Sequence, residues 1–323
     1  MKVSKGTCNS VRVGLDSGAH SIYLKFFAKK GGIDRYDRAD FSYTDEPEFK
    51  KYLQDYINFL LDNEEILDLY VNLDIIGNPE KTWEIQKYIE SYGLKPLPVF
   101  HFGEDFKWLY KYLDEYDYIG LGGLGQDISK NKWISMFGDP CFTIICPPPT
   151  YMPRVKVHGF AVTSPDMLIR YPWASVDSTS WVMYGKYGII LVPKKEQGKF
   201  DYTKSPICVG VSRRSPKMSI DGIHFLSMPP TFQIAVQEYL EEKGFIIGDS
   251  TFKEVSTDYV LQENENWCDR KRTPYVVESI IERGVCNDHK QRDHVNLMYF
   301  LDLERSFPQW PWPWKAKKLH RLC

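Results

Sequence analysis

The sequence lacks any hydrophobic run that approaches the ~18 apolar residues of a membrane-spanning helix. It also lacks an excess of either charge, because 41 Lys and Arg residues are balanced by 43 Asp and Glu residues and the formal net charge is −2. A globally basic surface that would hold nucleic acid without sequence preference is therefore excluded. Any nucleic-acid site on this chain must be a local patch.

Cysteine is scarce and scattered. Seven Cys residues, an odd number, are spread over 323 residues, which argues against the disulfide framework of a secreted protein. Residues 1–6 lack the apolar stretch of a signal peptide, and the sequence contains no repeat or heptad pattern. We therefore expect a cytoplasmic protein with reduced thiols that does not associate with a membrane.

The residues that are present favour a folded chain with a large core. Hydrophobic residues make up 43% of the chain and charged residues 26%, which is not the composition of a disordered protein. Aromatic residues are abundant, at 15%. The length suits one barrel-sized domain with an appendage, or two ordinary domains.

Short apolar runs alternate with helix-like stretches over the first 195 residues. The runs that predict buried strands are Val11–Leu15, Leu69–Ile76, Leu97–His101, Tyr118–Leu121, Val155–Val162, Ala174–Val176 and Ile189–Val192. Helices are predicted between them, over Pro47–Leu61, Pro79–Tyr92, Asp105–Leu113 and Ser164–Arg170. Such alternation indicates parallel strands joined by crossover helices. We expect an α/β fold with a TIM (β/α)8 barrel over residues 1–195, and an open doubly wound sheet is the alternative.

The pattern changes in the remaining residues, 196–323. After a basic, loop-like stretch, helices are predicted over Pro230–Lys243, Glu263–Arg283 and Asp288–Leu303, so we expect a mainly helical C-terminal extension. Basic runs in or beside it are Lys194–Lys195, Arg213–Arg214, Arg270–Arg272 and Lys315–Arg321. They make the extension a candidate platform for nucleic acid, although a solvated face explains each run equally well.

Polar residues and glycines follow almost every predicted strand. Asp16 and Ser17 follow the first, Asp74 lies within the second, and His101 closes the third. The later strands carry Gly122, Gly123, Leu124, His158 and Asp177. Each has an ordinary explanation by itself, as a turn residue or a hydrogen-bonded core histidine. Because the carboxyl ends of barrel strands meet at one mouth, their recurrence predicts a concave site there.

Two carboxylates in such a site, Asp16 and Asp177, indicate substitution at a sugar carbon. One carboxylate would attack the anomeric carbon and the other would carry a proton. Spacing alone does not separate such an enzyme from a sugar hydrolase or a lyase.

Four segments resemble the tRNA-guanine transglycosylase family, in family order over residues 11–181. Leu15–His20 is similar to the family's Thr-Asp-Ser-Gly-Gly-Phe segment, and Ile119–Leu124 to its Gly-Gly-Leu loop. His158–Leu168 resembles its Gly-x-Gly-x-Pro-Glu-Asp-Leu segment, and Ser175–Ser178 the segment with its nucleophilic Asp. The pattern most resembles the phage-type branch, which is associated with placing 7-deazaguanines in DNA.

The resemblance implies a TIM barrel that exchanges a guanine base for a 7-deazaguanine without breaking the polymer. It implies that Asp177 attacks C1′ to form a covalent glycosyl-enzyme, and that Asp16 handles the proton of the leaving and entering bases. Asp74 matches a base-reading Asp, and His101 stands where the family has a Gln. Backbone groups of the glycine loop would meet the base, and two His residues would stack on it. The base-binding residues implied are Ser17, His20, Asp74, His101, Gly122, Gly123, Leu124 and His158.

The chain also departs from the family. The substrate loops are short, and Ser178–Trp181 replaces the Pro-Thr-Arg that follows the nucleophile. The Cys-x-Cys-x2-Cys zinc cluster is absent. The nearest substitutes, Cys268, Cys286, His289 and His294, are residue types that bind zinc, but their spacing is not a finger pattern. We therefore expect no cofactor, and zinc bound by these four residues is the less favoured alternative.

These features lead to one principal expectation and three alternatives. The principal one is a guanine transglycosylase acting on DNA, with a free 7-deazaguanine base as co-substrate, in the host cytoplasm if the chain is phage-encoded. The alternatives are the same exchange on tRNA, a base-removing hydrolase, and a non-catalytic nucleic-acid-binding barrel. The missing zinc cluster favours DNA over tRNA, and the two carboxylates argue against a simple binder.

Overall fold

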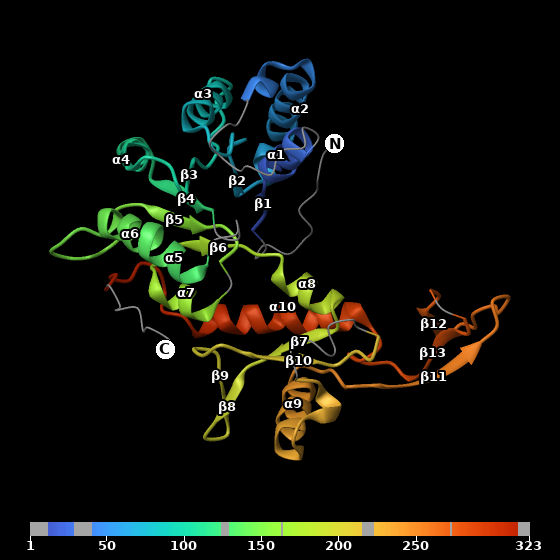
Figure 1. Ribbon diagram of the computed structural model, residues 1–323. Helices are drawn as coiled ribbons and strands as arrows, with labels where there is room; N and C mark the ends of the chain where they lie inside the picture. The colour runs from blue at the N-terminus through green and yellow to red at the C-terminus, as the bar shows by residue number, and fades with distance from the viewer. Residues whose placement is uncertain are drawn as a thin grey trace. The chain divides into compact units, whose positions relative to one another are not determined.

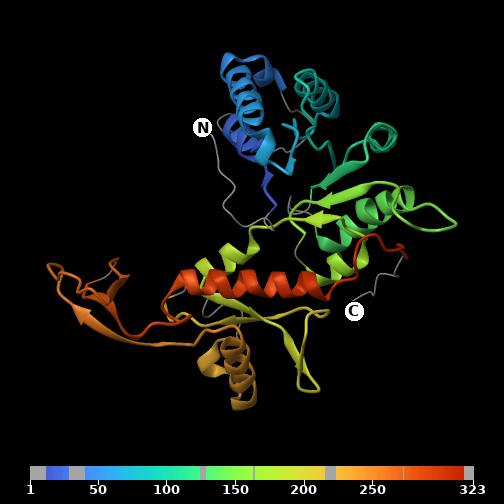
Figure 2. The ribbon, with the colours of Figure 1, turned by 180° about the vertical axis from the view of Figure 1, so that it is seen from behind.

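The computed structural model describes residues 12–28, 41–123, 129–162, 164–214, 223–271 and 273–315. The chain forms two compact units (Figures 1 and 2). The first comprises Met1–Val162, Arg170–Asp177 and Trp310–Cys323, and the second comprises Thr163–Ile169 and Ser178–Gln309. The division expected at residue 195 falls inside the second unit.

The first unit is built on parallel strands whose spatial order follows the chain. β1 (Gly14–Leu15) pairs with β2 (Leu69–Tyr70), and a parallel bridge joins Val71 to Leu97. A four-stranded parallel sheet then contains β3 (Val99–His101), β4 (Tyr118–Gly122), β5 (Lys156–Gly159) and β6 (Ser175–Val176). Each strand predicted from Val11–Leu15 to Ala174–Val176 corresponds to one of these strands, of which β4 extends one residue beyond its prediction and the others are shorter than predicted. The mixed α/β class with parallel strands is confirmed.

This unit contains helices that the sequence predicts, beginning at Pro47, Pro79 and Phe106, and others that it does not predict, beginning at Ala19, Lys130 and Asp139. They are α1 (Ala19–Ala28), α2 (Pro47–Asn63), α3 (Pro79–Glu90), α4 (Phe106–Glu115), α5 (Lys130–Trp133) and α6 (Asp139–Ile145). Proline occupies a first-turn position of α2 and α3, where its missing N–H costs nothing. The side chain of Asn78 accepts a hydrogen bond from the N–H of Lys81, and that of Asp105 accepts one from Lys107.

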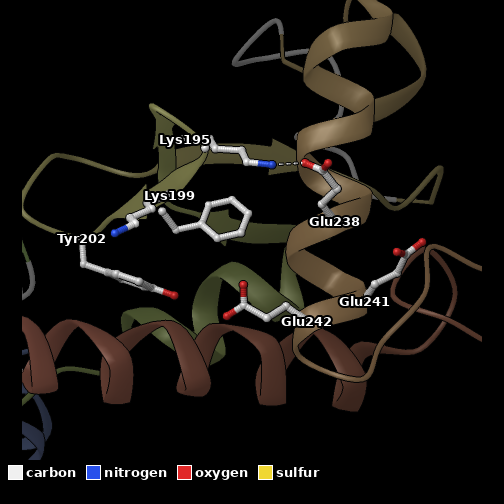
Figure 3. Close-up of a pocket in the computed structure, with 8 residues that line it drawn as sticks. Lys195, Lys199, Tyr202, Glu238, Glu241 and Glu242 are labelled. Atoms are coloured by element: carbon white, nitrogen blue, oxygen red, sulfur yellow. Dashed lines mark hydrogen bonds and ion pairs between the residues drawn. The ribbon is translucent and has the colours of Figure 1, made fainter.

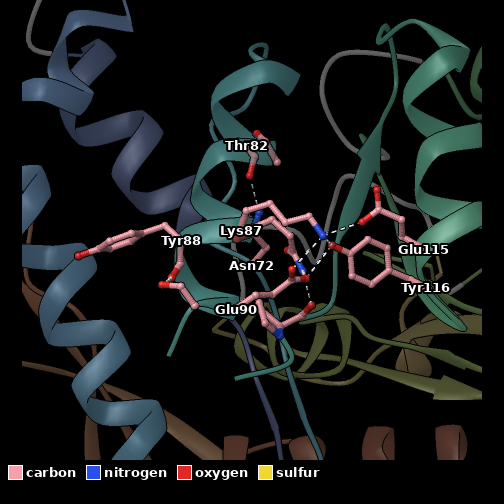
Figure 4. Close-up of polar contacts among 10 residues, drawn as sticks. Asn72, Thr82, Lys87, Tyr88, Glu90, Glu115 and Tyr116 are labelled. Carbon is pink, nitrogen blue, oxygen red and sulfur yellow. Dashed lines mark hydrogen bonds and ion pairs between the residues drawn. The ribbon is translucent and has the colours of Figure 1, made fainter. Parts of the chain in front are cut away.

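Polar contacts join α3 to α4 (Figure 4). The Lys87 Nζ lies 2.9 Å from Glu90, 2.7 Å from Glu115 and 3.0 Å from the hydroxyl of Tyr116. The Tyr116 hydroxyl donates to Glu90 at 2.6 Å. These contacts hold together two helices that follow β2 and β3, the strands whose ends carry Asp74 and His101.

Much of the aromatic content packs into one buried cluster of the first unit. Phe142 stacks on Tyr171 with ring centroids 4.5 Å apart, and Trp173 meets Phe142 edge-on at 5.0 Å. The C-terminal Trp segment returns here, because Trp310 donates to the carbonyl of Pro172 and Trp314 lies 6.4 Å from Phe142. The tail therefore packs on this cluster through the buried Trp314 and the partly buried Trp310, while Lys317, Lys318 and Arg321 lie outside the described residues.

The second unit corrects two expectations. β7 (Ile189–Val192) pairs with β10 (Ile207–Gly210) in antiparallel register, so it is not a further parallel strand. The helix predicted over Glu263–Arg283 is wrong. That stretch forms β12 (Glu265–Asp269) and β13 (Tyr275–Glu282), which complete an antiparallel sheet with β11 (Asp249–Val255). Its apolar residues are largely β-branched and pair across strands.

The extension is therefore mixed rather than mainly helical. The other elements of the second unit are α7 (Pro165–Arg170), α8 (Ser180–Lys186), α9 (Pro230–Glu242), α10 (His289–Ser306) and the hairpin of β8 (Lys194–Glu196) and β9 (Lys199–Asp201). The helices predicted over Ser164–Arg170, Pro230–Lys243 and Asp288–Leu303 are confirmed. Buried Asn296 of α10 holds this unit together, since it accepts from the N–H of Leu191 and donates to the carbonyls of Trp181 and Ile189.

Candidate functional site

The parallel register brings the predicted polar residues to one edge of the strands. His101 pairs with Gly122 at the ends of β3 and β4, and His158 pairs with Ser175 on β5 and β6. Asp177 directly follows β6, and Asp16 directly follows β1. The carboxyl ends of these strands therefore carry carboxylates, imidazoles and glycines, as the sequence predicts.

Asp16 is exposed, and its Oδ1 accepts a 3.3 Å hydrogen bond from the N–H of Gly18. Such a contact is typical of a turn, and it gives a structural reason for an Asp directly before Ser-Gly. Ser17 is buried, and its Oγ finds no hydrogen-bond partner among the described residues. His20 is exposed on the first turn of α1. The loop after β1 and the first turn of α1 thus present the Asp16 carboxylate and the His20 ring to solvent.

Asp74 is a buried carboxylate, with only 5% of its side chain exposed. Asn72 donates to its Oδ1 at 3.3 Å and also to the carbonyl of Thr82, which anchors the loop after β2 to α3 (Figure 4). Burial raises the pKa of Asp74 from 3.8 to about 7, although the nearby His101 opposes the shift. Asp74 can therefore accept or donate a proton near neutral pH.

His101 lies between two carboxylates. Its Nε2 is 3.7 Å from Asp74, and its Nδ1 is 3.6 Å from Glu104. Burial works to lower the pKa of His101, but Glu104 and Asp74 outweigh it and the pKa is raised. The backbone N–H of His101 also donates to Glu104 at 3.0 Å.

Glu104 is a site residue that sequence reasoning missed. The His-x-x-Glu spacing immediately before the Asp105 cap was the available signal, because the turn between β3 and α4 carries both side chains. The side chain of Glu104 is only 5% exposed, and its Oε1 has no hydrogen-bond partner in the described part of the chain. The buried group is therefore a carboxylate–imidazole–carboxylate row.

The glycines at the end of β4 and directly after it are required by close packing. A Cβ on Gly122 would lie 2.7 Å from Cδ2 of His101, and one on Gly123 would lie 2.7 Å from Cβ of Phe102. Gly123 also has a φ of +90°, which only glycine adopts readily. The His101 ring therefore covers the end of β4. Leu124, the third residue of this predicted loop, lies outside the described residues.

Asp177 lies near an imidazole, as Asp74 and Glu104 do, but it is exposed. Its side chain is 54% accessible to solvent, whereas each of the other two is 5% accessible. Its Oδ1 accepts a 2.8 Å hydrogen bond from the N–H of Ala161 and lies 3.8 Å from the Nε2 of His158. Ala161 holds a φ of +59°, a strained value for a residue with a side chain. This backbone conformation accompanies the hydrogen bond from the Ala161 N–H to the Asp177 carboxylate.

His158 is buried and in contact on several sides. Its Nδ1 is hydrogen-bonded to the Oγ of Ser175, which in turn lies 2.6 Å from the hydroxyl of Tyr118. Its ring meets Phe160 edge-on at 4.5 Å. Tyr118 and Ser175 are two further residues that sequence reasoning missed, because only the register of β4, β5 and β6 brings them to His158.

The charge of Asp16 acts on both His158 and Asp74, so Asp16 lies near each of them. Burial lowers the pKa of His158, and the charges of Asp177 and Asp16 oppose that shift. Asp16 also adds to the raised pKa of Asp74, after burial and Glu104. In the first unit, the exposed carboxylates Asp16 and Asp177 therefore influence His158, and the buried carboxylates Asp74 and Glu104 influence His101.

The residues considered for zinc do not gather into a metal site. Cys268 lies on β12, Cys286 precedes α10, and His289 and His294 are on α10. Burial raises the pKa of both thiols, which disfavours the thiolate that a metal needs. Within the described ranges, no group of three or more His, Cys, Asp or Glu side chains is arranged to hold a metal ion.

The second unit has an open groove between the β8–β9 hairpin and α9 (Figure 3). Its charged lining residues are Lys195 and Lys199 on the hairpin and Glu238, Glu241 and Glu242 on α9. Lys195 pairs with Glu238 across the groove. Since two lysines and three glutamates line the groove, an anionic and a cationic ligand would each meet charges of their own sign there.

Comparisons with known proteins and a search for membrane helices complete the description. Among the helices in the described part of the chain, none is long and apolar enough to cross a membrane. No family model, curated protein or solved structure matches this chain.

Proposed function

We propose that the chain is a base-exchange glycosyltransferase that replaces a guanine in a nucleic acid with a 7-deazaguanine. The observation that carries the proposal is the set of three carboxylates at the strand ends. Asp16 and Asp177 are exposed and Asp74 is buried, and all three act on His101 or His158. A pair of accessible carboxylates suits substitution at a sugar carbon, and a buried carboxylate suits selective hydrogen bonding to a purine edge.

The exchange proceeds by two displacements at C1′. The Asp177 carboxylate forms a bond to C1′ as the bond from C1′ to guanine N9 breaks, and Asp16 supplies the proton that the leaving base takes up. Asp16 then removes the N9 proton of the incoming base, whose nitrogen bonds to C1′ and releases Asp177. The exposure of both side chains supports these roles, since each must reach the substrate.

In the proposed enzyme, Asp74 and His101 recognise the base. An ionised Asp74 accepts hydrogen bonds from the N1–H and the 2-amino group of a guanine-type base, and adenine offers no such pair of donors. Because the carboxylate is buried, leaving it unpaired costs several kcal/mol, which rejects the wrong base. His101 and Gly122 border the same position.

We also propose that the parallel strands belong to a (β/α)8 barrel. Their order follows the chain from β1 to β6, as in a barrel, whereas a doubly wound sheet reverses its order at a switch point. The site at the carboxyl ends of these strands is where barrel enzymes act.

DNA is the proposed polymer, and tRNA is the alternative. Several basic residues of the expected platform are already paired: Lys195 with Glu238, and Arg214 with buried Glu278. Arg270 and Lys271 are the exposed basic residues that remain at the turn after β12. The polymer preference thus rests on the resemblance in sequence, and the experiment must compare both.

The test is incubation of the protein with labelled guanine or a 7-deazaguanine and either guanine-containing DNA or tRNA, followed by nucleoside analysis. We expect incorporation into DNA by the parent and none by Asp177→Asn, because an amide is a poor nucleophile. Asp114→Asn on α4 is the matched control, since it makes the same chemical change at an exposed position outside the site. Incorporation into neither polymer, or full activity of Asp177→Asn, would contradict the proposal.

A further inference from the structure

We propose that His158, held by Ser175 and Tyr118, is a positioning residue that orients the Asp177 carboxylate for attack through Oδ2. The inference rests on the proposed function for its catalytic meaning. The resemblance implies that His158 stacks on the base, whereas this inference gives His158 the task of positioning Asp177.

The geometry is a row of four side chains on three neighbouring strands. Tyr118 on β4 contacts Ser175 on β6, Ser175 contacts the Nδ1 of His158 on β5, and His158 Nε2 faces Asp177. The side chain of His158 is only 8% exposed, whereas that of Asp177 is 54% exposed. The row therefore runs from the interior to the accessible carboxylate.

Donor and acceptor counting sets the direction of the row. Ser175 has a single O–H. If it donates to Tyr118, His158 must use Nδ1–H toward Ser175, and its bare Nε2 would then face the negative Asp177. If Ser175 donates to Nδ1, Tyr118 donates to Ser175 and Nε2 carries the hydrogen toward Asp177. Only the second arrangement gives every group a complementary partner.

Both contacts to Asp177 involve the same oxygen. The N–H of Ala161 donates to Oδ1 at 2.8 Å, and His158 Nε2 is 3.8 Å from Oδ1. Among the described residues, no hydrogen bond or ion pair to Oδ2 is found. Holding one oxygen leaves the other for the sugar carbon. The longer distance to His158 shortens once substrate excludes water, as catalytic contacts often do.

His158 is poorly placed to stack on a base. Its Nδ1 edge meets Ser175, its Nε2 edge faces Asp177, and Phe160 lies against the ring at 4.5 Å. Burial lowers the pKa of His158 despite the charges of Asp177 and Asp16, so the neutral form with one N–H prevails at pH 7. A neutral imidazole in one tautomer is suited to orienting a carboxylate.

The tautomer can be measured without any enzymatic assay. Nitrogen-15 NMR of the labelled histidines, with the His158 signal assigned by its loss in His158→Gln, reports which ring nitrogen carries the hydrogen. We expect the Nε2–H form in the parent, a mixture of forms in Ser175→Ala, and recovery of the single form in Ser175→Thr, which restores the hydroxyl. Tyr299→Phe removes a buried hydroxyl from the second unit and should leave the signal unchanged.

Exchange assays on the same variants connect the tautomer to chemistry. Ser175→Ala should slow exchange by about 10-fold, and Tyr118→Phe by less, while polymer and free-base affinities stay at parent values. An Nδ1–H form in the parent, or a Ser175→Ala variant with parent tautomer and parent rate, would overturn the positioning role. If neither polymer is a substrate but the tautomer responds as expected, the proposed function fails and the placement of Asp177 by His158 stands.

Discussion

Asp74 illustrates how much of a residue's chemistry depends on its surroundings. A carboxylate inside an apolar run was recognisable in the sequence, and its burial beside Asn72 and His101 follows from the loop after β2. Its raised pKa was not predictable, because the pKa depends first on burial and then on His101, Glu104 and Asp16, which are distant in sequence. Local sequence identifies a candidate side chain, and the tertiary fold determines its protonation state.

The pH dependence of stability should report the buried Asp74 directly. Its pKa is about 7 in the native state and near 3.8 in the unfolded chain, so between these values the unfolded chain binds fewer protons. The free energy of unfolding should therefore fall as pH rises from about 4 to 7, by on the order of 4 kcal/mol in total. Denaturant unfolding of the parent and Asp74→Asn measures this, because the variant lacks that contribution. Parallel stability curves for the two proteins would show that Asp74 is not buried.

Base discrimination should depend on the same side chain. Asp74→Ala should lose affinity for guanine and 7-deazaguanine far more than for the polymer, and the preference over adenine should shrink. In the parent, guanine affinity should fall as pH drops below about 7, because a protonated Asp74 cannot accept from both donors. Calorimetric titration with guanine and adenine at several pH values measures both effects. Lower thermal stability with an unchanged preference ratio would mean that Asp74 only anchors its loop.

At the scale of elements, predictions were most successful where a local signal marks a boundary. The helices at Pro47 and Pro79 carry a proline start, and Asn78 and Asp105 are N-caps. The helix expected over Glu263–Arg283 failed because its apolar residues, such as Val277 and Ile280, fit either period over a short window. Pairing of β13 with both β11 and β12 decided the outcome, and a single sequence does not show such pairing.

The same limit applies to the site. Asp16, His101 and Asp177 were identified because each lies at the end of an apolar run, and Asp74 was identified because it lies inside one. The partners Ser175 and Tyr118 lie inside strands, where they look like ordinary sheet residues, and only the register makes them neighbours of His158.

Gly122 gives a test of how the end of β4 supports His101. In Gly122→Ala, the new Cβ would lie 2.7 Å from the His101 ring and must displace it. We expect a stability loss of about 1–3 kcal/mol and weaker guanine affinity with intact polymer binding. Gly14→Ala on β1 is the matched control, because no atom of the described residues lies within 4 Å of a Cβ there. Equal effects of the two substitutions on guanine affinity would separate His101 from base recognition.

At the scale of the whole molecule, a net charge of −2 means that polymer binding depends on local cations. Many of the basic side chains are paired, as Lys195 is with Glu238 and Lys204 is with Glu196. Arg270 instead lies over the ring of Trp267, 4.9 Å from its centroid, beside exposed Lys271. A basic, aromatic turn of this kind suits a nucleic-acid backbone and its bases.

Salt dependence should identify that contact. The double variant Arg270→Ala, Lys271→Ala should weaken polymer binding and reduce the slope of log affinity against log salt by roughly 1–2, with free-base affinity unchanged. Lys204→Ala, which removes a paired cation, should leave the slope near the parent value. Fluorescence anisotropy with labelled DNA over a series of salt concentrations measures the slopes. A double variant with the parent slope would place the polymer elsewhere on the protein.

The central claim is that Asp177 forms a covalent bond to a nucleic-acid sugar. Intact-mass spectrometry after rapid denaturation of the protein with a guanine-containing oligonucleotide, and no incoming base, measures it most directly. We expect an adduct with the mass of the protein plus the oligonucleotide minus guanine, attached to the peptide that contains Asp177 and absent in Asp177→Asn. No adduct with either DNA or RNA, or an adduct that persists in Asp177→Asn, would contradict the claim.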